Sequence, residues 1–262
     1  MDFGMPFLLE TASIEDCSEL CSSLNLNFIE LNMNFPQCQL AVLNADKLNR
    51  IKKNSKLYFT IHLDENLNVC DFNSAIRDAY LETTLGVIAL AKEINAPIIN
   101  MHLAKGIYIT LPDRKEFLFM KFESEYMSNI LVFKEICEKA IGTSDIKIAI
   151  ENTTGFMEHE KAAIEMLLQS DCFGLTLDIG HSHSAQDKDM DFFQKHIGKL
   201  IHMHAHDAEG SSNHLAFGDG EIDLRRSIQL AQKANVRVVL ETKTVAALTA
   251  TVKRLSELKD KN

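Results

Sequence analysis

The chain has 262 residues, 46% of them hydrophobic, and a formal net charge of −10 at pH 7. This length and apolar content predict one domain with a sizeable core, spanning residues 1–262. The acidic balance excludes a general affinity for nucleic acid or anionic membranes, although it leaves a local basic patch open. No stretch is long and apolar enough for a membrane helix, and residues 1–10 lack signal-peptide features, so we expect a soluble, cytoplasmic protein.

Strand-like and helix-like segments alternate from the start of the chain. Four apolar runs in the first half predict strands, and a helical pattern follows each of them. The pairs are 5–10 with 13–24, 27–32 with 40–53, 57–62 with 73–94, and 97–102 with a helical region over 114–141 that is broken at most once.

The second half continues the same alternation. Its strand–helix pairs are 146–151 with 159–169, 173–178 with 190–196, 199–204 with 224–234, and 236–241 with 245–258. Eight such pairs predict a parallel barrel surrounded by helices, the (β/α)8 TIM barrel. An open doubly wound sheet is the alternative, but no GxGxxG loop follows the first strand to favour it.

The last four predicted strands each end in a residue of a type that binds metal. These residues are Glu151, Asp178, His204 and Glu241. The carboxyl ends of parallel strands meet at one rim of a barrel, which is where such folds carry their chemistry. Three carboxylates and an imidazole can converge there on one divalent cation, and manganese, zinc, magnesium or cobalt would suit this mixed set of ligands.

Seven of the ten histidines also fall at or just after the ends of predicted strands. Side chains alternate along a strand, so parity does not separate His202, His204 and His206. Depth favours His204 as the ligand, because His202 lies one pleat deeper in the interior and His206 belongs to the following loop. We expect His181 to fold over the same rim from a glycine-containing turn, and His183 to be solvated in a loop.

Five segments of the second half carry a resemblance to a known family. IENTTGF, LTLDIGHSH, HMHAHDAE, HLAFGDGEID and VVLETKT, in this order, resemble segments of the xylose-isomerase-like barrels. That superfamily includes sugar-phosphate isomerases and epimerases, hydroxypyruvate isomerase, inosose dehydratase and endonuclease IV. The resemblance covers essentially the whole chain in architecture and is most specific from Glu151 to Thr244.

In the isomerase and epimerase branch, the resemblance implies that the four strand-end residues hold one divalent metal ion. It also implies that Glu151 and Glu241 act as catalytic bases on opposite sides of a substrate carbon. A residue matching His181 contacts substrate in this branch, and His214 lies in a segment that resembles the loop closing over the sugar. We therefore expect an isomerase, epimerase or related lyase for a small sugar or polyhydroxy carbonyl compound, phosphorylated or not.

The endonuclease IV branch, in which three zinc ions cut DNA beside an abasic site, supplies the alternative function. There the resemblance implies that eight positions are metal ligands: His62, His102, Glu151, Asp178, His181, His204, His214 and Glu241. Ser212 stands where that enzyme has an aspartate, and serine is a poor zinc ligand. The segments QCQLAVLN and LDENLNVCD also lack cations for phosphate contacts, so we do not expect nucleic acid as a partner.

Further candidates for the substrate site come from both halves of the chain. The positions of His62 and His102 line the pocket in small-molecule members of the superfamily, so we expect both residues to bind substrate, and metal binding by them is left open. Lys243 alternates to the side of Glu241, so it is also expected to bind substrate, whereas Lys105 is expected to be solvated. The expected partner is a small molecule, and a homo-oligomer is left open. A barrel that binds without catalysis is disfavoured, because an unused cluster of buried carboxylates is costly.

Overall fold

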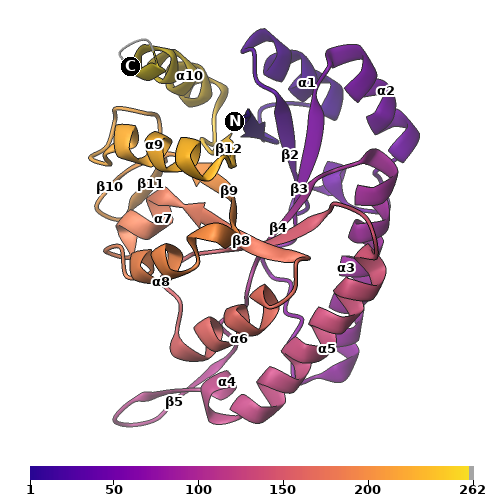
Figure 1. The fold of residues 1–262 in the computed structure, drawn as a ribbon, viewed down its shortest axis with the longest axis vertical. Helices are drawn as coiled ribbons and strands as arrows, with labels where there is room; N and C mark the ends of the chain where they lie inside the picture. The colour runs from indigo at the N-terminus through magenta and orange to yellow at the C-terminus, as the bar shows by residue number, and fades with distance from the viewer. Residues whose placement is uncertain (260–262) are drawn as a thin grey trace.

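Eight parallel strands close into a barrel in the structure, a computed structural model that describes residues 1–259. Helices surround the barrel (Figure 1), and the strand order around it is β1–β12–β9–β8–β7–β4–β3–β2. The strands are β1 (Phe3–Pro6), β2 (Phe28–Asn32), β3 (Tyr58–His62), β4 (Ile98–His102), β7 (Lys147–Glu151), β8 (Phe173–Asp178), β9 (Leu200–Ala205) and β12 (Arg237–Leu240). The predicted TIM barrel is confirmed.

The α-helices connect these strands and cover them from outside. They are α1 (Ile14–Ser23), α2 (Ala45–Ser55), α3 (Ser74–Ile94), α4 (Leu118–Lys121), α5 (Glu123–Ile141), α6 (Glu158–Leu168), α7 (Ile179–Ser184), α8 (Met190–Lys195), α9 (Leu224–Ala234) and α10 (Val245–Lys259). Side chains fix several of the helix starts, as where Ser13 Oγ accepts the Asp16 N–H at 3.1 Å. No helix within residues 1–259 is long and apolar enough to cross a membrane.

Two antiparallel hairpins lie outside the barrel sheet. They are β5 (Tyr108–Thr110) with β6 (Lys115–Phe117), and β10 (Asp207–Glu209) with β11 (Ser212–Leu215). The first hairpin projects from the barrel beside α4 (Figure 1), so the prediction of a helix from residue 114 is wrong for 114–117. The Leu111 N–H donates to the Arg114 carbonyl at 2.8 Å, which closes a tight turn between the two strands.

The first strand lies earlier than the predicted 5–10. The chain turns after β1, where the Leu8 carbonyl accepts both the N–H and the hydroxyl of Thr11, at 3.1 and 2.7 Å. Leu9 belongs to the apolar run but is 80% exposed in this turn. The prediction of one domain over residues 1–262 stays a prediction, and residues 260–262 lie outside the described residues.

A layer of buried polar side chains crosses the barrel interior beneath the carboxyl ends of the strands. Its members, here called the polar floor, are Glu30, Thr60, Asn100, Thr176 and His202. Branched apolar residues usually fill such an interior, and buried polar groups require hydrogen bonds. The Thr60 hydroxyl donates to Glu30 at 2.9 Å, and the Thr176 hydroxyl donates to Asn100 at 2.6 Å. The prediction that His202 fills the interior is confirmed.

Candidate metal centre

The structure brings the four predicted strand-end residues together above the polar floor. One oxygen or nitrogen atom from each of Glu151, Asp178, His204 and Glu241 lies within 4.8 Å of the others, and all four residues are buried. His204 Nδ1 is central to this group. It lies 3.1 Å from Glu151 Oε1, 3.0 Å from Glu241 Oε2 and 3.9 Å from Asp178 Oδ2.

These distances fit a shared cation. Ligand atoms about 2.1 Å from a metal ion lie about 3.0 Å apart in octahedral geometry and about 3.4 Å apart in tetrahedral geometry. His204 Nδ1 and Glu241 Oε2 are buried and lie 3.0 Å apart, but neither forms a hydrogen bond of good geometry in the described part of the chain. Buried polar atoms left unpaired are costly, so a cation bound among them would satisfy both.

The two glutamates are held in their ionised form. Burial alone would raise the pKa of Glu151, but His204 and His102 outweigh burial and hold this pKa well below its usual value. Burial acts in the same direction on Glu241, and there His204 and Lys243 lower the pKa well below its usual value. Both side chains are therefore carboxylates at neutral pH, the form that can bind a cation or accept a proton.

Asp178 is positioned by the short helix α7 and by His206. The Asp178 Oδ1 atom accepts the His181 N–H at 2.6 Å and thereby caps α7. His181 and His183 both lie in this helix, so the predictions of a turn at His181 and of a loop at His183 are wrong. His206 Nδ1 accepts the His214 N–H at 2.8 Å and lies 3.1 Å from the Asp207 carbonyl oxygen. His206 Nε2 donates to Asp178 Oδ2 at 3.2 Å and also lies 3.1 Å from Asp178 Oδ1.

The close approach of α7 to His206 depends on a glycine. A Cβ atom added at Gly180 would lie 1.8 Å from His206 Cε1 and 2.3 Å from its Nδ1, well inside contact distance. The absent side chain therefore leaves room for the imidazole. His206, predicted to lie in a loop, does follow β9 directly but is fully buried, and this burial was missed.

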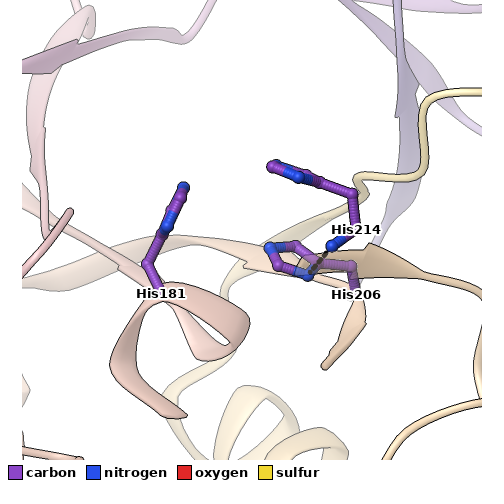
Figure 2. Close-up of side chains that lie close together, drawn as sticks. All are labelled: His181, His206 and His214. Carbon is purple, nitrogen blue, oxygen red and sulfur yellow. Dashed lines mark hydrogen bonds between the residues drawn. The ribbon is translucent and has the colours of Figure 1, made fainter. Parts of the chain in front are cut away.

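Three histidines form a second group beside the centre (Figure 2). The rings of His206 and His214 stack with centroids 4.3 Å apart, and the His181 ring stands nearly perpendicular to both. One ring nitrogen from each histidine lies within 4.8 Å of the others, but both ring nitrogens of His206 already have partners. The group therefore places the predicted substrate-binding residues His181 and His214 at the rim of the centre without offering a second complete ligand set.

His62 and His102 contact Glu151 Oε2, whereas His204 contacts Glu151 Oε1. Each places Nε2 3.3 Å from Glu151 Oε2, and the Asn100 side-chain amide also donates to this oxygen. Burial lowers the pKa of His62, but Glu151 outweighs burial and raises it to about 9. Both histidines therefore border the centre, and the prediction that they bind substrate stays a prediction.

Lys243 joins the centre to a neighbouring cavity. Its Nζ lies 2.7 Å from Glu241 Oε1, and its side chain is 52% exposed. The cavity has a volume of about 380 Å³, and Phe7, Phe35 and Asn34 are among its lining residues. Lys105, predicted to be solvated, is instead half-buried and donates to Thr154 Oγ1 and the Gly155 carbonyl at 2.5 and 2.8 Å.

Sequence reasoning missed Glu30 and Asn100 entirely. Both lie inside predicted buried strands, as the acidic residue of NFIELN and the amide of PIINMH. A charged or amide side chain within a predicted buried strand could have indicated these residues, because buried polar groups need hydrogen-bond partners. Glu30 contacts two histidines, at 2.9 Å from His202 Nε2 and 2.8 Å from His204 Nε2.

A closed parallel barrel with a buried carboxylate–histidine cluster at its carboxyl rim defines a TIM barrel with a candidate metal centre. Residues 18–260 match the family model of the xylose isomerase-like TIM barrel. The chain belongs to this family, and the resemblance found in its sequence is confirmed.

The individual proteins that resemble this chain share at most 26% of its residues among those given below. The chain is 26% identical over 216 residues to the uncharacterised protein MJ1614 of Methanocaldococcus jannaschii, across 77% of this chain and 78% of that protein. A D-tagatose 3-epimerase-like protein superposes with a TM-score of 0.80 at 22% identity, over 99% of this chain and 97% of that one.

Two further solved structures share the fold. The 3-keto-D-glucoside 4-epimerase of E. coli has a TM-score of 0.75 at 14% identity, over 99% of both chains. The IolI protein with a bound zinc atom has a TM-score of 0.76 at 16% identity, over 100% of this chain and 99% of that one. At these identities the structural matches establish the fold.

Proposed function

We propose that this protein is a divalent-metal-dependent isomerase or epimerase, or a related lyase, acting on a small sugar or polyhydroxy carbonyl compound. The observation that carries the proposal is the convergence of Glu151, Asp178, His204 and Glu241, which would be the metal ligands. Manganese, zinc, magnesium and cobalt all suit this ligand set. When bound, the cation would polarise a carbonyl oxygen and the adjacent hydroxyl of the substrate.

Glu151 and Glu241 would be the two catalytic bases. Glu151 ends β7 and Glu241 directly follows β12, and β8 and β9 lie between these two strands in the barrel. The carboxylates therefore reach the centre from two sides, as two-base proton transfer at one carbon requires. Glu241 Oε1 is contacted by the half-exposed Lys243, so it faces the open side where substrate would enter.

The surroundings of the centre fit a small polyhydroxylated substrate. His62, His102, His181, His214 and Lys243 would be the substrate-binding residues, since each borders one of the two glutamates or Asp178. In the adjacent cavity, the Phe7 and Phe35 rings lie 5.2 Å apart and offer apolar contact to the C–H groups of a sugar. The amides of Asn32 and Asn34 offer hydrogen bonds to its hydroxyls. The epimerase names of two solved structures and the zinc in IolI support the same proposal.

Solvent deuterium exchange tests this function. The metal-loaded protein is incubated in deuterated water with a panel of ketoses and aldoses, both free and phosphorylated, and the products are examined by NMR. Proton transfer next to a carbonyl is expected to place deuterium on one substrate carbon. Metal-loaded protein that neither converts nor labels any member of a broad panel would argue against the proposal.

An abasic-site DNA endonuclease is the second candidate. The observation that favours it is the contact of His62 and His102 with Glu151, a group whose donor atoms also lie within 4.8 Å of one another. The net charge of −10 opposes it, because phosphate contacts need cations. Elemental analysis and incision assays separate the candidates: about one metal ion per chain and no incision supports the isomerase, whereas two or three ions with zinc-dependent incision supports the endonuclease.

A further inference from the structure

Glu30 lies in the polar floor directly beneath His204. It is 2% exposed, and its Oε2 accepts the Thr60 hydroxyl at 2.9 Å and lies 2.9 Å from His202 Nε2. Its Oε1 lies 2.8 Å from His204 Nε2. A carboxylate buried this deeply is costly unless it is paired, and Glu30 has three donor groups around it.

His204 stands between Glu30 and the candidate metal centre. Its Nε2 faces Glu30, whereas its Nδ1 faces Glu151 and Glu241 at 3.1 and 3.0 Å. A neutral imidazole carries its proton on one nitrogen and a lone pair on the other. The carboxylate of Glu30 favours the proton on Nε2, which leaves the Nδ1 lone pair directed at the centre.

Glu30 is not placed to be a metal ligand itself. Glu30, His202 and His204 do bring donor atoms within 4.8 Å of one another. However, Glu30 Oε2 is already occupied by Thr60 and His202, and only Oε1 remains. A neutral His204 has one lone pair, so a cation bound at Nε2 would leave the four-residue centre without its nitrogen ligand.

We infer that Glu30 is a positioning residue: it holds His204 with its proton on Nε2 and thereby sets the metal affinity of the centre. The inference rests on the proposed metal site and gives Glu30 no contact with substrate. Glu30 belongs to β2, which lies across the barrel from β8, and its three contacts hold its carboxylate in place. Loss of such an outer partner commonly weakens metal binding by about 10–100-fold.

The test compares Glu30→Gln with Thr60→Val. Glutamine keeps the shape of the side chain but puts an NH2 group among three donors, so at least one histidine loses its acceptor. Thr60→Val removes one donor from the same carboxylate and leaves the contact with His204 intact. Metal-free proteins are titrated with Zn²⁺ against a chromophoric chelator, and the Co²⁺-loaded proteins are compared by visible absorption.

Glu30→Gln is expected to raise the Kd for zinc by about 10–100-fold and to alter the Co²⁺ bands, while Thr60→Val stays near wild type. Glu30→Asp, which keeps the charge but withdraws it from Nε2, is expected to fall between them and guards against a folding defect in Glu30→Gln. Thermal unfolding of the metal-free proteins shows whether each variant is folded. If both Glu30 variants showed the Kd and the Co²⁺ bands of the wild type, the role of Glu30 would be wrong but the metal site would stand. If the wild-type protein bound neither ion, the metal site itself would be wrong.

Discussion

His204 Nδ1 and Glu241 Oε2 lie 3.0 Å apart because two neighbouring strands hold their residues in register. In the β9–β12 pair His204 lies opposite Val239, and the Glu241 N–H continues the ladder by donating to the Ala205 carbonyl at 3.0 Å. A slip of one residue would turn Glu241 to the other face of the sheet. The backbone of the barrel therefore fixes this contact, and the site is expected to keep its shape when a ligand atom is changed.

Glu151→Gln and Asp178→Asn are each expected to lose bound metal and activity while the protein remains folded. A rim ligand contributes affinity, whereas the strand-interior aliphatic side chains form the core. Metal content by elemental analysis and folding by circular dichroism measure the two effects. Glu158→Gln and Asp171→Asn are matched controls, because their side chains are 86% and 99% exposed. Full metal content in both rim variants would contradict the site.

Glu241→Gln is expected to stop net turnover in protein that still holds metal. Removal of one of two bases leaves Glu151 able to exchange a proton only on its own side of the substrate. Product formation and deuterium uptake, measured together by NMR, distinguish these steps. Product formed at the wild-type rate by metal-loaded Glu241→Gln would rule out the two-base scheme.

Lys243→Met is expected to lower kcat/KM by about tenfold or more, chiefly through KM, without loss of metal. Lys243 lies at the border between the centre and the cavity, and a charged hydrogen bond to substrate contributes about 1.5–3 kcal/mol. Steady-state kinetics and metal content measure the two expectations. Lys195→Met, which removes a lysine that is 66% exposed on α8, is the control. An unchanged KM would remove Lys243 from the substrate site.

Glu160→Gln is expected to stabilise the protein above pH 6. Burial raises the pKa of Glu160 from 4.5 to about 6, although its bond from the Met157 N–H opposes the shift. The ionised form is therefore disfavoured in the fold, and this cost is absent below about pH 4.5 and complete above about pH 6. One pKa unit corresponds to about 1.4 kcal/mol, so the cost is about 2 kcal/mol.

Urea unfolding at pH 4.5 and pH 7.5 checks this expectation. Glutamine retains an oxygen for the Met157 N–H, so wild type and variant should match at pH 4.5 and differ by about 1–2 kcal/mol at pH 7.5. Glu158→Gln changes an exposed residue two positions away in the same first turn of α6, and it should show no such difference. A variant less stable than wild type at pH 7.5 would mean that the ionised carboxylate stabilises the helix start.

The convergence of Glu151, Asp178, His204 and Glu241 was predictable because each residue ends a strongly apolar run of the sequence. Once eight strand–helix pairs indicate a parallel barrel, strand ends must meet at one rim. Their convergence is geometric, and their roles as ligands and bases remain predictions.

The support beneath and beside the site was not predictable in the same way. The partners of Glu30 lie on β3 and β9, 30 and 172 residues away in the sequence, so no local pattern pairs them. His206 is buried by α7 and by the hairpin that carries His214, and neither element has a sustained period. The β5–β6 hairpin was not predicted for a related reason, because three-residue strands are too short to show an alternation of apolar and polar residues.

A Cβ atom at position 180 would lie 1.8 Å from His206, so the residues allowed at these two positions, 26 residues apart, depend on each other. A methyl group at position 180 and an imidazole at position 206 exclude each other in this backbone. Gly180 therefore cannot be substituted while His206 is retained. Among relatives, any side chain at the position of Gly180 should accompany a smaller residue at the position of His206. Such a relative must then orient the aspartate equivalent to Asp178 by another donor, and an alignment of the family would reveal the pair as covarying.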